Sequence, residues 1–299
     1  MKPPDTCLPT GAGARLSFST GAFPPDQFRR ALEWAARLPV AGIELGLHHA
    51  QPMAESKRTR QAARAQFERL GVRPLSVHAW TQVEGLPEVC PFAAEIGAGL
   101  IVVHCPDEAI ARDFSGQVDG LTRWHEWCRE RNLILTVENA SIQPLAPFVR
   151  LFEAVPGLAM TLDIKHAYKP EKLGLTHADY LRALGDRVAN LHMTGIDRAR
   201  DELGDSTPPG RDAVDWRRLA RDLADREYSG LVTMEWTYPS HLDAQAIERA
   251  YAGIQPATPG AVTLSERLTA WCAEFYRDKF SPILAEPAGR AAGAAGGSI

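Results

Sequence analysis

Short apolar stretches recur along the chain and alternate with longer stretches in which apolar residues follow a helical period. The apolar stretches read as strands, because they are too short for typical helices and are bounded by turn residues. Between them, sets such as Phe28, Leu32 and Ala35 fall on one face of a helix. The predicted strands begin near residues 16, 42, 73, 100, 133, 158, 188 and 230. The pattern therefore predicts eight consecutive strand–helix units.

The fourth predicted strand, residues 100–103, is apolar at every position. A continuous apolar strand is typical of a parallel sheet that is covered on both faces. Eight strand–helix units in a chain of this length predict an α/β fold, a (β/α)8 TIM barrel, as a single catalytic domain over residues 15–280. An open doubly wound sheet is the alternative, but the Gly-rich phosphate loop that often follows the first strand of that fold is missing from the sequence.

Both ends of the chain are expected to lie outside the barrel. Residues 1–14 read as a flexible tail and lack the basic and apolar regions of a secretory signal. Residues 281–299 are rich in Ala, Gly and Pro, and we expect them to be disordered.

The amino-acid composition disfavours several classes of protein. Hydrophobic residues make up 45% of the 299 residues, which is enough for a large core. No uncharged apolar run reaches the roughly 18 residues of a membrane span. The five cysteines are scattered and never form a C-x-x-C pair, which favours a reducing cytoplasm over a disulfide framework. The net charge of −4 provides no basic footprint, so neither nucleic acid nor an anionic membrane is expected as a partner.

Ionisable residues stand at the carboxyl ends of most predicted strands. They are His78, His104, Glu138, Asp163, His192 and Glu235, with His166 three residues beyond Asp163. In a TIM barrel these strand ends meet at one mouth, where active sites lie. Burying so many ionisable groups together is costly unless a cation or a substrate offsets them. Three carboxylates and an imidazole suit one divalent metal ion, Mn²⁺, Mg²⁺, Co²⁺ or Zn²⁺, so the sequence predicts a shared metal site.

Each of these residues also has a structural interpretation. Asp163 can cap a helix while His166 lies at the surface, and His78 can be a hydrogen-bonded histidine of the core. We interpret Glu44, on the second predicted strand, as a structural partner within the barrel. The pair His48-His49 is expected to close that strand beside the cleft.

Six short motifs occur in order along the chain: Ser76-Val77-His78-Ala79, Val102-Val103-His104, Val137-Glu138-Asn139, Leu162-Asp163-x-x-His166, Leu191-His192-Met193 and Met234-Glu235. Together they resemble the xylose isomerase-like TIM barrel superfamily over about residues 15–280. That superfamily includes sugar isomerases, ketose 3-epimerases, hydroxypyruvate isomerase, inosose dehydratase types and zinc-dependent AP endonucleases. The resemblance is specific for the superfamily and much less specific for the substrate.

The resemblance implies a role for each metal-site residue. Glu138, Asp163, His192 and Glu235 would bind the metal ion. Glu138 and Glu235 would also serve as acid and base across a sugar carbon.

The same resemblance implies a substrate side of the cleft. His166 would hydrogen-bond a substrate oxygen, and Arg198 matches the position of a substrate-binding arginine in the ketose 3-epimerases. His78 and His104 are also expected to face the substrate. The segment 208–212 resembles the family's P-G-x-G turn but lacks the second glycine.

On this interpretation the protein is a metal-dependent isomerase or epimerase of a sugar or sugar phosphate, acting through proton abstraction next to a carbonyl and an enediolate. A dehydratase of a cyclitol or keto sugar begins with the same step, and the strand-end residues do not separate the two. An AP endonuclease-like phosphodiesterase is disfavoured, because the Asp-x-His pair for its third zinc is missing from the loop after the seventh strand. A non-catalytic sugar-binding protein is also disfavoured, because idle buried carboxylates destabilise a fold. A homo-oligomer is left open, with the last helix and the loop 196–212 as candidate interfaces.

Overall fold

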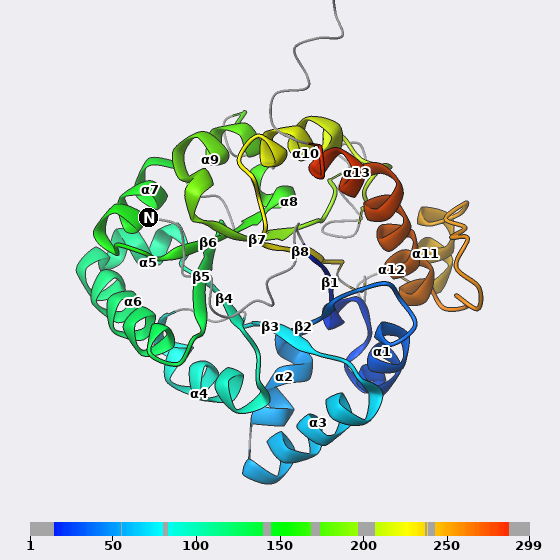
Figure 1. The fold of residues 1–299 in the computed structure, drawn as a ribbon, viewed down its shortest axis with the longest axis horizontal. Coiled ribbons are helices and arrows are strands. Elements are labelled where there is room, and N and C mark those ends of the chain that lie inside the picture. Colours follow the sequence, from blue (N-terminus) through cyan, green and yellow to red (C-terminus); the bar gives the residue numbers. More distant parts are fainter. Residues whose placement is uncertain are drawn as a thin grey trace, which may run out of the picture.

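The computed structural model describes residues 15–54, 56–79, 83–139, 145–168, 174–196, 207–236, 238 and 243–286. Eight parallel strands form a closed barrel in the order in which they occur in the sequence (Figure 1). The strands are β1 (Arg15–Ser19), β2 (Gly42–Gly46), β3 (Pro74–His78), β4 (Leu100–His104), β5 (Ile134–Glu138), β6 (Ala159–Asp163), β7 (Val188–His192) and β8 (Leu231–Met234). The predicted (β/α)8 TIM barrel is confirmed.

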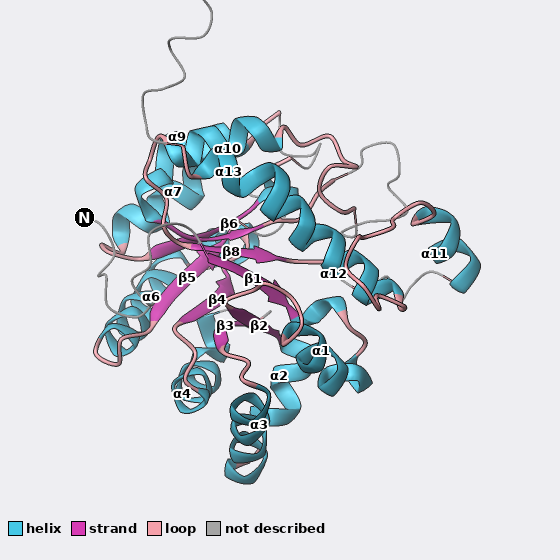
Figure 2. Cartoon of the chain, turned by 45° about the vertical axis from the view of Figure 1, so that its right-hand side comes forward, coloured by secondary structure: helices cyan, strands magenta, loops and turns pink. Residues whose placement is uncertain are grey.

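Helices surround the barrel on all sides, as Figures 1 and 2 show. They are α1 (Phe28–Ala35), α2 (Leu47–Ala54), α3 (Lys57–Leu70), α4 (Leu86–Ile96), α5 (Asp107–Arg112), α6 (Phe114–Arg129), α7 (Leu145–Ala154), α8 (Ile164–Ala167), α9 (His177–Leu184), α10 (Trp216–Ala224), α11 (Ala244–Ala250), α12 (Leu264–Phe275) and α13 (Ser281–Leu284). Within the described residues, no helix is both long enough and apolar enough to cross a membrane.

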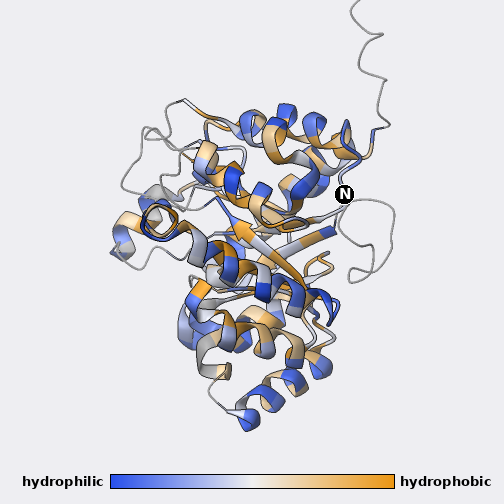
Figure 3. Cartoon of the chain, turned by 90° about the vertical axis from the view of Figure 1, so that its left-hand side faces the viewer, coloured by the Kyte–Doolittle hydropathy of each residue, from blue (hydrophilic) through white to orange (hydrophobic). Residues whose placement is uncertain are grey.

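The main core lies between the strands and the helices. In β4, Ile101 and Val103 point outward into this core, which also holds Leu121 of α6 and Phe148 of α7. Figure 3 shows that the strands are mostly apolar and that polar positions lie on the outer faces of the helices. The helical periodicity of the sequence and the continuous apolar strands both follow from this arrangement, because each strand is buried on two faces and each helix on one.

The inside of the barrel changes from apolar to polar towards the carboxyl ends of the strands. A second, smaller apolar cluster consists of strand residues and includes Leu100, Val102 and Leu231. Beyond it, five buried polar residues form a middle layer: Ser76, Thr136, Thr161, Asn190 and Thr233. Each of them lies two positions before an ionisable residue of the strand end. Because side chains two apart in a strand point the same way, the ionisable residues also point into the barrel.

The helical shell extends beyond the predicted domain boundary at residue 280. A π-helical turn, Tyr276–Phe280, connects α12 to α13, and the buried Phe280 ring lies 6.2 Å from the ring of Trp216 in α10. Figure 1 shows α13 beside α10. The expectation of disorder from residue 281 is therefore wrong for Ser281–Leu284, because Phe280 anchors this segment. The rest of the two predicted tails, residues 1–14 and 287–299, lies outside the described residues.

Candidate metal centre

Four side chains from neighbouring strands converge at the mouth of the barrel. Glu138 ends β5, Asp163 ends β6, His192 ends β7, and Glu235 directly follows β8. One potential ligand atom from each lies within 4.8 Å of the corresponding atom of every other. All four residues are buried, with Glu235 the most exposed at 7%. The structure thus brings together the four residues that the sequence nominates as metal ligands.

Asp163 uses its two carboxylate oxygens differently. Oδ1 accepts a hydrogen bond of 2.9 Å from the backbone N–H of His166 and so caps α8. Oδ2 is buried and forms no hydrogen bond with any described residue. The helix-cap interpretation of Asp163 is therefore confirmed, and it involves one oxygen only, so that the other oxygen faces the cluster. His166 is not at the surface, since only 9% of it is exposed.

His192 lies between two carboxylates that contact different ring nitrogens. Its Nε2 lies 3.3 Å from Oε2 of Glu44, on β2 across the barrel. Its Nδ1 lies 3.0 Å from Oε2 of Glu235 and 3.7 Å from Oε2 of Glu138. The Nδ1 atom therefore faces the converging carboxylates, and the Nε2 atom faces away from them.

Glu44 belongs to this group, although the sequence suggests only a structural partner within the barrel. It is fully buried, and the hydroxyl of Ser76 donates a hydrogen bond of 2.9 Å to its Oε2. Its Oε1 lies 3.5 Å from Nδ1 of His78. The sequence does contain a signal for it, because a single charged residue inside the short buried strand Gly42–Gly46 needs a partner inside the barrel.

His78 lies between the two glutamates that are expected to transfer protons. Its Nε2 is 3.0 Å from Oε2 of Glu138, and its Nδ1 is 3.0 Å from Oε1 of Glu235. His104 lies beside it, with its Nε2 3.2 Å from Oε2 of Glu138. The His78 side chain is only 2% exposed, whereas that of His104 is 26% exposed and reaches the solvent-facing side of the mouth.

Opposite charges stabilise one another in the interior. Burial alone would raise the pKa of Glu138, but attraction to His78 and hydrogen bonds from His104 and His78 hold it well below the ordinary value. Burial would likewise raise the pKa of Glu235, and attraction to His192 and His78 lowers it. Burial would lower the pKa of each of these two histidines, but the neighbouring glutamates raise it well above 6.5. In the absence of a metal, imidazolium charges thus compensate the carboxylates.

Asp163 differs from the two glutamates. Burial raises its pKa to about 7, against the attraction of Lys165 and with added repulsion from Glu138 and Glu235. The Nζ of Lys165 is 3.7 Å from Oδ2 of Asp163. This oxygen therefore faces a positive charge but has no hydrogen bond within the described part of the chain.

The remaining residues that the sequence predicts for the cleft are His48, His49 and Arg198. The strand β2 ends at Gly46, and His48 and His49 lie on α2, which begins one residue later. The Nε2 atoms of His48 and His49 lie 3.2 and 3.0 Å from the backbone oxygens of Phe23 and Pro24. The expectation that this pair closes the second strand is therefore wrong, because these rings hold the loop that follows β1. Arg198 lies outside the described residues.

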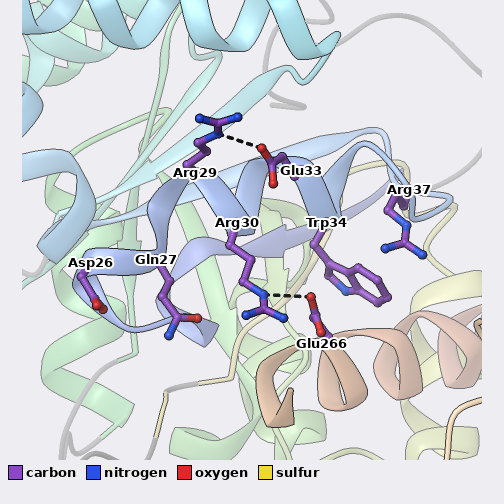
Figure 4. A pocket seen from close by; sticks show the side chains of 8 residues that line it. All are labelled: Asp26, Gln27, Arg29, Arg30, Glu33, Trp34, Arg37 and Glu266. Carbon is purple, nitrogen blue, oxygen red and sulfur yellow. Dashed lines mark hydrogen bonds and ion pairs between the residues drawn. The ribbon is translucent and has the colours of Figure 1, made fainter. Parts of the chain in front are cut away.

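A separate cleft of about 630 Å³ lies on the outside of the barrel, between α1 and α12 (Figure 4). Arg30 and Glu266 face each other across it, with Arg30 Nε 3.0 Å from Glu266 Oε1. Glu266 also accepts hydrogen bonds from the backbone at the start of α12. The Arg30–Glu266 pair thus holds α1 and α12 together.

Comparison with known proteins agrees with the fold. A sequence model of the family described as xylose isomerase-like TIM barrel matches residues 26–255. Fructoselysine 3-epimerase from Escherichia coli O157:H7 is 29% identical over 172 residues, which cover 56% of this chain and 50% of that protein. The match thus spans about half the length of this curated relative.

Two solved structures resemble the whole barrel. A xylose isomerase-like TIM barrel protein from Mycobacterium smegmatis in complex with magnesium aligns with a TM-score of 0.65 and 13% identity, covering 91% of this chain and 98% of that one. The structure of L-ribulose 3-epimerase aligns with a TM-score of 0.62 and 12% identity, covering 91% and 94%. At these identities the likeness concerns the fold.

Proposed function

This chain belongs to the xylose isomerase-like TIM barrel family, and from that premise we propose that it is a divalent-metal-dependent isomerase or epimerase of a sugar. The observation that carries the proposal is the convergence of Glu138, Asp163, His192 and Glu235 within 4.8 Å at the barrel mouth. Epimerases among the similar proteins support the same class of reaction.

The buried polar atoms support a metal ion at this site. Asp163 Oδ2 is buried and has no hydrogen-bond partner among the described residues. It faces His192 Nδ1 at 4.0 Å, and this nitrogen lies 3.0 Å from Glu235 Oε2. A buried polar atom without a hydrogen bond is costly, and a cation that these atoms coordinate together would offset this cost. Three carboxylates and one imidazole are donors that Mn²⁺, Mg²⁺, Co²⁺ and Zn²⁺ accept. We therefore assign Glu138, Asp163, His192 and Glu235 as the ligands.

A bound divalent cation would polarise a substrate carbonyl and its neighbouring hydroxyl, which acidifies the C–H bond between them. Glu138 and Glu235 are the candidate bases for that proton, since each has two oxygens and both carboxylates are ionised in their surroundings of imidazoles. One glutamate takes the proton to leave an enediolate, and the other returns it. Return to the opposite face inverts the carbon, and return to the adjacent carbon interconverts aldose and ketose.

We propose that His166 holds a substrate oxygen. Its Nε2 lies 3.7 Å from Oε1 of Glu138 and 4.0 Å from Oδ2 of Asp163, at the edge of the cluster. A hydrogen bond from this ring would favour the negative charge that develops on an enediolate oxygen. His104, more exposed than His78, would contact the substrate from the other side of Glu138. Arg198 is retained as a proposed substrate contact from the sequence.

The substrate class we favour is a ketose, with epimerisation at a carbon next to the carbonyl. The names of the similar proteins, fructoselysine 3-epimerase and L-ribulose 3-epimerase, support this choice. Both names describe an inversion next to a ketone. Proton removal and return by two carboxylates across one carbon is the chemistry that such an inversion requires.

The test is turnover of ketoses, aldoses and cyclitol ketones by the Mn²⁺-loaded protein in D₂O, followed by NMR. We expect deuterium to enter at a carbon next to the carbonyl and the sugar to rearrange. The same protein treated with a chelator is the control and should leave the substrates unchanged. Loss of water from a cyclitol ketone would instead identify a dehydratase. Unlabelled substrates throughout, together with cleavage of an abasic DNA duplex in Zn²⁺, would overturn the proposal.

A further inference from the structure

We propose that Glu44 is a positioning residue of the metal centre, which fixes the tautomer and the ring orientation of His192. The inference rests on the proposed metal-dependent function. It adds a residue on β2 to a site whose assigned ligands come from β5 to β8. Glu44 would act on the metal through His192 and not by direct contact.

The Glu44 carboxylate is itself held in place. It is fully buried, and Oε2 accepts the hydrogen bond of 2.9 Å from the Ser76 hydroxyl. The same oxygen lies 3.3 Å from Nε2 of His192. Because a carboxylate is an acceptor only, Nε2 must carry the proton in this contact. Ser76 therefore holds the Glu44 carboxylate in place, and this carboxylate keeps the proton of His192 on Nε2.

A proton on Nε2 leaves the lone pair of a neutral imidazole on Nδ1. This Nδ1 atom is buried and faces the other assigned ligands. It lies 3.0 Å from Glu235 Oε2, 3.7 Å from Glu138 Oε2 and 4.0 Å from Asp163 Oδ2. Metal-binding histidines commonly donate their other ring N–H to a carboxylate in this way, which sets the tautomer and raises the basicity of the ligand.

Glu44 could instead be a ligand, because Glu44, His78, His192 and Glu235 also have donor atoms within 4.8 Å of one another. However, that group shares His192 and Glu235 with the assigned site. If both groups held an ion through His192, its ring would have to lose both N–H protons, including the one that faces Glu44. A single ion bound at Nδ1 of His192, with Glu44 accepting the hydrogen bond from Nε2, leaves the imidazole neutral and requires no loss of a second proton.

Two conservative substitutions of Glu44 distinguish the effect of the position of its carboxylate from the effect of its charge. Glu44→Asp keeps the charge but withdraws the carboxylate by one methylene, away from His192. Glu44→Gln keeps the length. Its amide oxygen, in the position of Oε2, can still accept from both His192 Nε2 and the Ser76 hydroxyl, while its amide N–H₂, in the position of Oε1, faces Nδ1 of His78. A positioning role predicts that Glu44→Asp weakens metal binding by about 10- to 100-fold, and that Glu44→Gln retains most of the affinity. Glu266→Gln, at a buried glutamate of the outer shell, is the matched control.

The measurements are Co²⁺ stoichiometry and affinity by chelator competition, and the visible spectrum of the bound Co²⁺. We expect one equivalent in every variant and an altered spectrum only in Glu44→Asp. Equal affinity in the wild type and both Glu44 variants would overturn the inference, as would weaker binding in Glu44→Gln than in Glu44→Asp. Loss of one of two equivalents would show that Glu44 is itself a ligand. A wild type that binds no metal would contradict the proposed function itself. Circular dichroism of each variant checks that it is folded.

Discussion

Asn139 holds the backbone of Asp163 with both ends of its side-chain amide. Its Nδ2 donates to the Asp163 carbonyl at 3.0 Å, and its Oδ1 accepts from the Asp163 N–H at 2.7 Å. Both residues are fully buried. The pair therefore fixes the end of β6 relative to the end of β5, and with it the distance between two assigned metal ligands, Glu138 and Asp163.

We expect Asn139→Ala to destabilise the fold and weaken the metal site together. Each backbone group of Asp163 that is left buried without a partner costs about 1–3 kcal/mol. Urea unfolding of the metal-free protein would measure the loss of stability, and chelator competition would measure the affinity for Mn²⁺. A variant with unchanged stability and unchanged affinity would show that the clamp is dispensable.

Glu138→Gln and Glu235→Gln should each nearly abolish turnover. Removal of a group that transfers a proton in the transition state costs about 10²–10⁴-fold in rate, and loss of a ligand charge should also weaken Mn²⁺ binding. Initial rates on the substrate identified in D₂O, with the rate of deuterium exchange, would measure this. Glu33→Gln, at a half-exposed glutamate on α1 that pairs with Arg29, is the control and should behave as the wild type. Full activity in both site variants would rule out the proposed chemistry.

Removal of the metal should lower the stability of the protein. A ligand that binds only the folded state adds about 2.7 kcal/mol at a concentration 100 times its Kd. We therefore expect the thermal midpoint to fall on dialysis against a chelator and to rise again with Mn²⁺. Asp163→Asn serves as the comparison, since it replaces a buried carboxylate of the assigned site with a neutral amide and should show a much smaller shift with Mn²⁺. Equal shifts in the two proteins would place the ion elsewhere.

A buried histidine outside the metal centre should make the fold sensitive to acid. His177 lies between Tyr168 and Asp222, with Nδ1 2.6 Å from the tyrosine hydroxyl and Nε2 3.2 Å from Asp222 Oδ2. Burial lowers the pKa of His177 below 6.5, against the opposing effect of Asp222. The unfolded chain therefore binds this proton more readily, so stability should be lost as the pH falls through about 6.5, the ordinary value for histidine.

The difference between wild type and His177→Asn isolates this effect. Asparagine can donate to Asp222 or accept from Tyr168 but does not titrate, whereas every other ionisable group is common to both proteins. We expect urea unfolding at pH 7.5 and 5.5 to show a larger loss of stability on acidification in the wild type. The same loss in both proteins would mean that His177 does not contribute to the pH dependence.

Much of the fold follows from local pattern. The strand starts predicted near residues 16, 42, 73, 100, 133, 158, 188 and 230 each lie within one residue of the observed starts at 15, 42, 74, 100, 134, 159, 188 and 231. This agreement is expected, because a parallel barrel buries every strand on both faces and so leaves a continuous apolar signal. The prediction fails at Ser281–Leu284, where α13 forms in a segment whose composition indicates disorder. This helix depends on a tertiary contact, because the Phe280 ring that precedes it packs against Trp216.

Local pattern is enough to predict that Glu138, Asp163, His192 and Glu235 meet at the mouth, since the carboxyl ends of consecutive parallel strands must lie at one edge of the barrel. It did not determine how they face one another. That Asp163 caps a helix with one oxygen and offers the other to the site is a matter of side-chain rotation. That Glu44 on β2 contacts His192 on β7 depends on closure of the barrel, which brings together residues 148 positions apart. Local pattern indicates that Glu44 needs a partner inside the barrel but does not identify that partner, because only the packed interior fixes the distance and the angle between the two side chains.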